Sequence, residues 1–337
     1  MRRWAIVLGS VKARNSFTNQ MRTGKLSLAC LLISLLALLS AQSSRAQDRA
    51  FITNQGSDSV SVLDLDRQSL ITTISVGEKP AGVSVCTDKK SIVISNPGDG
   101  SVSIIDQETL TVSDTIKTGD GPLAVVCGSK RLYIADWYNH QVAAYDRQTY
   151  QLIKTVPVGD SPSGLALSQD ETVLYVSSRD NDTIYELNCQ TLEIVRKAPS
   201  GHKPFGITLD HERKRLYVAN VQSDSVSVID TLEMKTIAEI AVGERPYAIA
   251  LAMGGTRALS TNQYDNTVSV IDTGTLEVID LIDVGEYPEG IFTDKDDNRV
   301  YVANWFDNTI SIIDLEEQKV VNEIAVEDGP RAYGNPR

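Results

Sequence analysis

Aromatic, charged and histidine residues occur at two positions of a repeated sequence motif. Side chains of these types could bind a ligand. The first point follows a short apolar run and carries Trp137, Tyr138, His140, Tyr264, Trp305 and Phe306. The second point is a Gly-x-x-Pro segment with the residues around it, and it carries His202, Phe205, Tyr247, Tyr287, Glu289 and Arg331. Aromatic walls with a few charges are typical of small-molecule sites and of the centres of protein interfaces.

The same residues leave an enzymatic alternative open. His202, Glu289, Arg331 and His140 could act as acid–base groups in a lactonase- or lyase-like hydrolysis or elimination. The chain has only three His, and none has the spacing of a zinc site. It contains no Gly-rich phosphate loop, Gly-x-Ser-x-Gly segment or Cys-x-x-Cys segment. We therefore predict neither a metal nor a cofactor, and we favour binding over catalysis.

One motif of about 42 residues is repeated seven times after residue 46. In each repeat a short apolar run ends at an Asn or its substitute: Asn54, Asn96, Asp136, Ser178, Asn220, Asn262 and Asn304. An Asp or Asn stands ten residues later, and every repeat then has a proline: Pro80, Pro122, Pro162, Pro204, Pro246, Pro288 and Pro330. Two residues after each proline stands Gly or Ala, which we attribute to crowding of inner strands about an axis.

Each repeat predicts four strands. In the fifth repeat, residues 216–219, 226–229, 237–242 and 247–251 are rich in β-branched side chains and bounded by Gly, Pro, Asn and Asp. Several runs, such as 60–63, are apolar on both faces, so both faces need cover. These patterns predict an all-β fold, a single seven-bladed β-propeller of four-stranded blades.

The two ends of the repeat array predict how the ring closes. The first repeat begins with residues 50–53, which correspond to the second strand of a blade. Residues 330–334 correspond to the inner-strand segment 246–250 of the fifth repeat. We therefore expect the C-terminal strand to complete the first blade, a 1+3 clasp that removes exposed sheet edges.

The repeats also resemble a known family. Residues 216–220 (LYVAN), 226–230 (VSVID) and 242–246 (VGERP) are similar to the YVTN β-propeller repeat family, and the resemblance covers about residues 49–334. The fourth repeat departs most, with Ser178 and Asn188 at the anchor positions. The resemblance implies an exported bacterial or archaeal protein with a binding, surface or scaffolding role, and it does not imply one reaction.

The site should lie where the repeats differ, because residues shared by all repeats have a structural role. In a four-stranded meander the loop after the second strand and the Gly-x-x-Pro crossover lie on the same rim. Aromatic loops of the third repeat should then face those of the sixth and seventh across the channel mouth. The residues directly after each proline should ring the opening: Ala81, Leu123, Ser163, Phe205, Tyr247, Glu289 and Arg331. The alternative is that these aromatic side chains simply pack between the blade tops.

Residues 1–46 differ from the rest of the chain. They contain seven basic residues, no Asp or Glu, and a Leu-rich run at 26–39 that precedes Ser44-Arg45-Ala46. This order predicts a signal peptide, with Met21 as a second candidate for the start, and a propeller domain over residues 47–337. An uncleaved anchor and an organelle transit peptide are the alternatives. We expect a periplasmic or secreted protein that is not inserted in the membrane after cleavage.

Removal of the leader changes the charge. The whole chain has 32 basic and 44 acidic residues, and without the seven basic residues of the leader 25 basic residues remain, a net charge of −19. Such a charge repels nucleic acid and anionic lipid. We therefore do not expect nucleic acid as a partner. We expect a monomer that binds a small molecule or a protein at the rim. A surface or envelope structural protein is a third alternative.

Three cysteines follow the leader. Cys86 and Cys127 lie at near-equivalent ends of predicted inner strands, six and five residues after their prolines. Equivalent residues of a rotational repeat point the same way and lie a blade spacing apart, so we expect no disulfide between them. Cys189 lies at an outer turn and is expected to be a free thiol.

Overall fold

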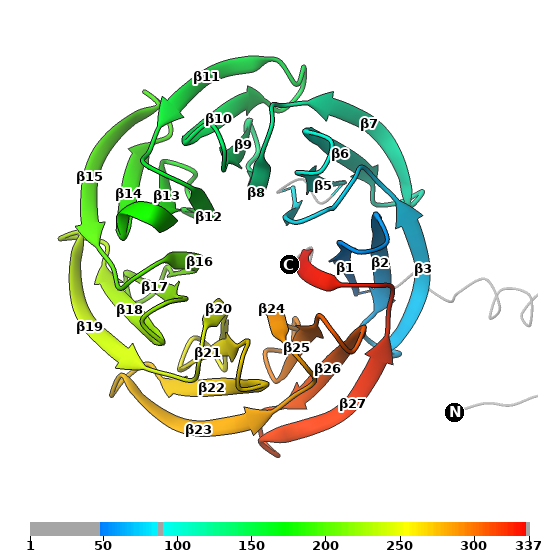
Figure 1. Cartoon of the computed structure of the whole chain (residues 1–337), viewed down its shortest axis with the longest axis vertical. Helices are drawn as coiled ribbons and strands as arrows, with labels where there is room; N and C mark the ends of the chain where they lie inside the picture. Colours follow the sequence, from blue (N-terminus) through cyan, green and yellow to red (C-terminus); the bar gives the residue numbers. More distant parts are fainter. Residues whose placement is uncertain (1–47, 87–89, 335–337) are drawn as a thin grey trace, which may run out of the picture. The chain divides into compact units, whose positions relative to one another are not determined.

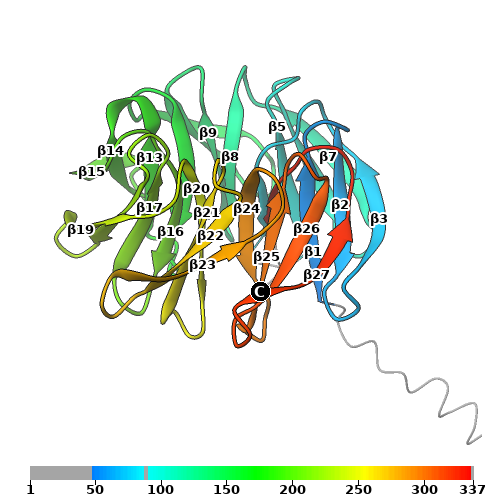
Figure 2. The ribbon, with the colours of Figure 1, turned by 60° about the horizontal axis from the view of Figure 1, so that its bottom comes forward.

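The computed structural model describes residues 48–86 and 90–334, which form a ring of seven four-stranded antiparallel sheets (Figure 1). Figure 1 looks down the axis of this ring, and Figure 2 shows the blades from the side. The predicted seven-bladed β-propeller is therefore confirmed. The predicted signal peptide lies outside the described residues. Within those residues, no helix has the length and apolar character needed to cross a membrane.

The blades are numbered here by sequence, and their strands are given from the channel outwards. Blade 1 consists of β28 (Pro330–Gly334), β1 (Arg49–Asn54), β2 (Ser59–Asp64) and β3 (Ser69–Ser75). Blade 2 consists of β4 (Val83–Val85), β5 (Ser91–Asn96), β6 (Ser101–Asp106) and β7 (Thr111–Lys117). Blade 3 consists of β8 (Pro122–Cys127), β9 (Arg131–Asp136), β10 (Gln141–Asp146) and β11 (Leu152–Pro157). Blade 4 consists of β12 (Pro162–Leu167), β13 (Val173–Ser178), β14 (Thr183–Asn188) and β15 (Glu193–Pro199), with a short 3₁₀ helix η1 (Arg179–Asn181) after β13.

The remaining three blades repeat this order. Blade 5 consists of β16 (Pro204–Asp210), β17 (Arg215–Asn220), β18 (Ser225–Asp230) and β19 (Lys235–Ala241). Blade 6 consists of β20 (Pro246–Ala252), β21 (Arg257–Asn262), β22 (Thr267–Asp272) and β23 (Glu277–Asp283). Blade 7 consists of β24 (Pro288–Thr293), β25 (Arg299–Asn304), β26 (Thr309–Asp314) and β27 (Lys319–Ala325).

The ring closes through β28, as the sequence predicts. This last strand pairs antiparallel with β1, and Phe51 is opposite Gly334. The order β28-β1-β2-β3 makes the C-terminal strand the innermost strand of blade 1 (Figure 1). The clasp gives β1 a partner on both sides, so β1 is not exposed as an edge strand.

The hydrophobic core lies between neighbouring blades. Every residue of β2 is buried, which confirms that both faces of this strand are covered. Between blades 6 and 7, for example, Val268 and Val270 belong to the same buried cluster as Val300 and Val302. Because each blade presents an apolar face to each neighbour, the ring buries strands that are apolar on both faces.

The repeated anchor residues hold the strands together by side-chain hydrogen bonds. The Asp series caps the turns before the outermost strands: Asp272 Oδ1, for example, accepts hydrogen bonds from the backbone of Gly274 and Thr275 in the turn before β23. The Asn anchors do not cap the turn that follows them but bind side chains of the next strand. The amide of Asn220 instead donates to Ser225 Oγ at 3.1 Å and to Ser227 Oγ at 2.9 Å.

Crowding about the axis is also confirmed. The amide of Gly164 in β12 donates to Ser177 Oγ at 2.7 Å, and this hydroxyl donates to the carbonyl of Phe205 in blade 5 at 2.7 Å. A Cβ atom at Gly206 would lie 2.5 Å from the carbonyl oxygen of Tyr247 in the next blade. Inner strands approach one another so closely that only Gly or Ala fits at this position.

The prediction of free thiols at the inner strands is wrong. Cys86 and Cys127 form a disulfide with a Cα–Cα distance of 4.7 Å. Successive side chains of a strand point to opposite faces, so the one-residue difference in their distance from the proline turns the two cysteines to opposite faces. The side chain from blade 2 therefore meets the one from blade 3. Cys189 is free, as predicted, and it is buried.

Candidate functional site

The loops after the second strands and the Gly-x-x-Pro crossovers lie together on one rim, as the sequence predicts. The backbone amide of Trp137, directly after β9, donates to the carbonyl of Gly121 in the crossover before β8 at 2.8 Å. The amide of Trp305, directly after β25, donates in the same way to the carbonyl of Tyr287 at 3.0 Å. The loops after the second strands are thus fixed against the crossovers on the same rim.

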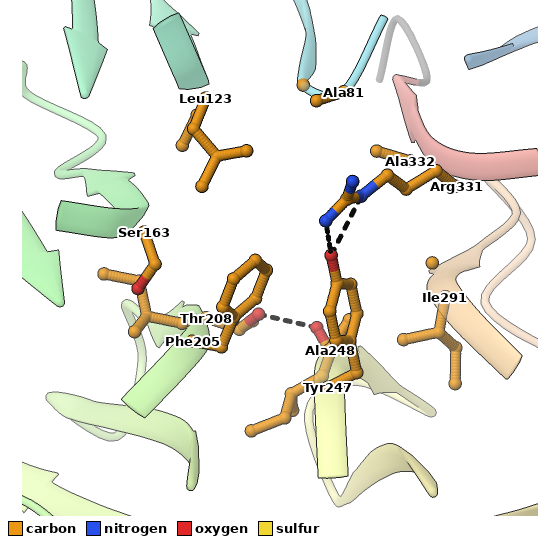
Figure 3. Close-up of a pocket in the computed structure, with 16 residues that line it drawn as sticks. Ala81, Leu123, Ser163, Phe205, Thr208, Tyr247, Ala248, Ile291, Arg331 and Ala332 are labelled. Atoms are coloured by element: carbon orange, nitrogen blue, oxygen red, sulfur yellow. Dashed lines mark hydrogen bonds between the residues drawn. The ribbon is translucent and has the colours of Figure 1, made fainter. Parts of the chain in front are cut away.

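The residues that follow the crossover prolines surround the channel. Six of the seven line a cavity of about 240 Å³ at the axis: Ala81, Leu123, Ser163, Phe205, Tyr247 and Arg331 (Figure 3). Figure 3 shows the rings of Phe205 and Tyr247 and the guanidinium of Arg331 extending into this space. The seventh, Glu289, is only 5% exposed and does not line the cavity.

The aromatic residues form a connected row across the mouth. The rings of Trp137 and Phe205 are 6.4 Å apart between centroids, and Phe205 stacks on Tyr247 at 4.4 Å. The guanidinium carbon of Arg331 lies 5.8 Å from the ring centroids of both Tyr247 and Trp305. Loops of blades 3 and 7 that the sequence places on opposite sides of an open mouth are therefore joined by side chains of blades 5, 6 and 1.

An ion pair between the half-buried Arg331 and the buried Glu289 adjoins this row. Arg331 Nε lies 3.2 Å from Glu289 Oε2, and Gln263 Nε2 donates to Glu289 Oε1 at 2.9 Å. Arg331 also donates from Nε and Nη2 to the Tyr247 hydroxyl, at 2.9 and 2.6 Å. Side chains of four strands or loops from blades 1, 6 and 7 thus hold one another in place.

Burial and charge shift the pKa values of this group. Burial raises the pKa of Glu289 above its ordinary value, although the charge of Arg331 and the hydrogen bond from Gln263 oppose the shift. Burial also raises the pKa of the Tyr247 hydroxyl. Burial works against the charge of Arg331, but the neighbouring oxygens of Tyr247 and Glu289 raise its pKa. The arginine stays cationic throughout the physiological range.

A second cavity of about 530 Å³ adjoins the first on the rim of blades 1 to 3. It shares Leu123, Phe205 and Arg331 with the axial cavity, and Trp137 and Tyr138 form part of its wall. Lys79 and Gln55 also line it. We did not predict these two residues, although Lys79 directly precedes the crossover proline and so occupies a variable position of the rim.

Three predicted aromatic residues form a separate cluster on blades 6 and 7. Tyr287 lies 5.9 Å from Tyr264 and 5.0 Å from Phe306 between ring centroids, and Arg245 lies 4.7 Å from the Tyr264 ring. Tyr264 is 56% exposed and Phe306 is 59% exposed. None of these residues lines the two cavities at the mouth, so the structure divides the predicted binding residues into a mouth group and this outer cluster.

The acid–base groups of the enzymatic alternative do not come together as a set. Only Glu289 and Arg331 are in contact. His140 Nδ1 accepts from the Ser161 amide at 3.1 Å, whereas His202 Nδ1 lies 2.8 Å from Asp182 Oδ2. Both imidazoles are exposed, and neither lines a cavity at the mouth. In the described part of the chain, no cluster of His, Cys, Asp and Glu is arranged to hold a metal ion.

Comparison with known proteins places this fold in a family. The model of the YNCE-like beta-propeller family matches residues 34–334. The chain belongs to this family. The match covers all seven repeats and agrees with the resemblance to YVTN-type repeats. No curated protein shows significant sequence similarity to the chain.

Solved structures resemble this YNCE-like beta-propeller in fold. A functionally unknown protein from Desulfotomaculum acetoxidans has a TM-score of 0.76 at 14% identity, with 86% of this chain and 98% of that chain covered. A putative 6-phosphogluconolactonase from Bacteroides fragilis has a TM-score of 0.74 at 16% identity, with 87% and 99% covered. Hydrazine synthase of Kuenenia stuttgartiensis has a TM-score of 0.71 at 18% identity, with 78% and 91% covered. These identities show the fold alone.

Proposed function

We propose that this YNCE-like beta-propeller binds a small molecule at the mouth of its central channel. The observation that carries the proposal is the convergence of Phe205, Tyr247, Arg331 and Trp137 on two adjoining cavities of about 240 and 530 Å³. Small-molecule sites are concave, largely apolar and aromatic, with a few fixed polar groups, and occupy about 300–1,000 Å³. The ion pair beneath the mouth fixes the orientation of the polar group before a ligand arrives.

Binding accounts for these residues better than acid–base catalysis does. A general acid or base needs to reach the reacting atom within hydrogen-bond distance. Glu289 has a raised pKa, but it lies behind Arg331 and outside the cavity lining. The exposed His140 and His202 belong to different blade junctions. The carboxylate of Glu289 therefore supports the guanidinium of Arg331 in the site.

A protein partner is the alternative occupant of this rim, and the outer cluster favours it there. Exposed aromatic side chains are enriched at the centres of protein interfaces. Tyr264 and Phe306 are more than half exposed, next to the half-buried Tyr287. We place a small molecule at the mouth and a protein partner, where there is one, on blades 6 and 7.

Export of the protein is part of the same proposal. The leader of residues 1–46 has the composition of a signal peptide. The Cys86–Cys127 disulfide supports this, because disulfides form and persist in oxidising compartments. N-terminal sequencing of the exported protein should find a chain that begins at Gln47, whereas a cytosolic chain that keeps the leader would contradict export.

Co-purification tests the binding site. The protein is isolated gently from its native source, and molecules released on denaturation are identified by mass spectrometry. We expect a stoichiometric small molecule with the wild type and its loss with Phe205→Ala. Tyr150→Ala is the matched control, because Tyr150 is a half-buried aromatic residue in the turn between β10 and β11, on the other rim. Equal recovery from all three proteins would contradict the proposed site.

A further inference from the structure

The side chains that line the mouth differ in charge from the rest of the protein. Beyond the leader, the chain has 44 acidic and 25 basic residues. The residues that line the two cavities at the mouth include Lys79 and Arg331 but no Asp or Glu. A surface taken at random from so acidic a chain would carry carboxylates. A cationic cavity in an acidic protein attracts an anion and concentrates it at this one place.

Arg331 has part of its hydrogen-bonding capacity left for a ligand. Its Nε and Nη2 donate to Tyr247, and Nε also faces Glu289. Among the described residues, none accepts a hydrogen bond from Nη1 or forms an ion pair with it. The guanidinium projects into the axial cavity (Figure 3). Glu289 faces Nε and does not line the cavity, so Nη1 is left for a ligand. A carboxylate there would gain a charge-assisted hydrogen bond.

Lys79 provides the second cation from a different part of the rim. It is exposed, it has no ion-pair partner in the described part of the chain, and it lines the same 530 Å³ cavity as Arg331. It lies in the crossover between β3 of blade 1 and β4 of blade 2. The cavity is therefore lined by the fixed guanidinium of Arg331 and the flexible ammonium of Lys79.

Flat apolar surfaces adjoin these cations. The ring of Phe205 lines both cavities, and Trp137 and Tyr138 form part of the wall of the larger one. Trp137 and Phe205 are half-buried, so each ring keeps a face or edge open. Aromatic side chains bury flat apolar groups most effectively by offset stacking or edge-to-face contact.

We propose that the mouth takes an anion with a flat apolar body, such as a carboxylate or sulfonate attached to a ring system. The acidic group lies against Arg331 and Lys79, and the rings lie against Phe205 and Trp137. This inference rests on the proposed function and names the chemical class of its ligand.

Three probes of the same shape and different charge test the inference. Binding of 2-naphthoate, 2-naphthamide and 2-naphthylmethylammonium to the full chain is measured by isothermal titration calorimetry. We expect 2-naphthoate to bind at least about tenfold more tightly than the neutral amide, and the cation more weakly than either. Added salt should weaken binding of the anion more than that of the amide.

Variants place the effect at the mouth. Lys79→Gln should weaken binding of 2-naphthoate by about two- to fivefold and leave that of 2-naphthamide unchanged, because Lys79 is an exposed cation whose loss removes only charge. Lys235→Gln is the matched control, since it removes an exposed cation from the start of β19, on the other rim. Phe205→Ala should weaken all probes.

The outcomes separate this inference from the proposed function. If the amide or the cation binds as tightly as 2-naphthoate and Phe205→Ala still weakens it, the anion preference is overturned while the mouth remains a binding site. If 2-naphthoate binds best but Phe205→Ala has no effect, the anion binds elsewhere and the assignment of the mouth is overturned. If none of the three probes binds, the ligand class is overturned. The co-purification experiment then tests the proposed function separately.

Discussion

The guanidinium of Arg331 donates two hydrogen bonds, of 2.9 and 2.6 Å, to the hydroxyl of Tyr247. Arg331 comes from β28, the strand that closes the ring in blade 1, whereas Tyr247 comes from β20 in blade 6. The clasp therefore does more than seal a sheet edge. It delivers the only cation of the axial cavity among the described residues, so closure of the ring and assembly of the site depend on the same strand.

Deletion of residues 330–337 should destabilise the protein and remove the site together. The deletion takes away the innermost strand of blade 1 and leaves one side of β1 without its partner. We expect the melting temperature to fall by about 10 °C or more, since a loss of 1 kcal/mol shifts it by about 2–4 °C in a domain of this order of size. Calorimetry measures the change, and an unchanged melt would show that β28 does not clasp the ring.

Counting of free thiols tests the disulfide. In denatured but unreduced protein without the leader, one thiol per chain should react, because Cys86 is paired with Cys127 and only Cys189 is free. Replacement of both paired cysteines by Ala should lower the free energy of unfolding by about 2–4 kcal/mol. Three reactive thiols would show that the pair is reduced in the isolated protein.

The remaining thiol should be inert in the folded protein. Cys189 is buried, and burial raises its pKa above the ordinary value, so little thiolate is present at neutral pH. Alkylation by iodoacetamide should therefore be slow in buffer and fast in denaturant. Rapid labelling of Cys189 without denaturant would mean that this outer turn of blade 4 opens readily.

The stability of the site should depend on pH through Glu289. Burial raises the pKa of this carboxyl, so the folded chain holds its proton more tightly than the unfolded chain does. Its contribution to the free energy of unfolding therefore falls as pH rises from the ordinary carboxyl range through the raised pKa. Lowering the pH from about 7 to about 5 should stabilise the wild type relative to Glu289→Gln.

Denaturant unfolding of both proteins at several pH values measures this difference. Several surface carboxyls have lowered pKa values, such as Asp106 and Asp146, and they act in the opposite direction in both proteins. The comparison cancels them. A difference that stays constant from neutral pH down to the ordinary carboxyl range would contradict a raised pKa for Glu289.

The fold could be predicted because each repeated residue meets one local structural need of the blade, such as a strand start, a turn or a close backbone approach. Pro246 starts an inner strand, Asp272 accepts the backbone amides of a turn, and Gly206 stands where a Cβ atom would meet the next blade. Such structural needs recur in every blade, so the same residue types recur at equivalent positions of the seven repeats. The clasp followed from the same comparison of residues 330–334 with 246–250.

The site could be predicted only in part, because it depends on how far side chains reach across the ring. Phe205 of blade 5 contacts Trp137 of blade 3, past the small Ser163 of blade 4, and no local pattern encodes that contact. The disulfide escaped prediction for the opposite reason, since an offset of one residue between Cys86 and Cys127 decides which way each side chain points.

Native mass spectrometry of the folded protein with its recovered ligand tests the central claim most directly. The account predicts a one-to-one complex for the wild type and for Tyr150→Ala, and at least about a tenfold loss of affinity for Phe205→Ala, since a buried aromatic contact contributes more than 1.4 kcal/mol. Wild-type affinity in the Phe205→Ala protein would contradict a ligand site at the mouth of the channel.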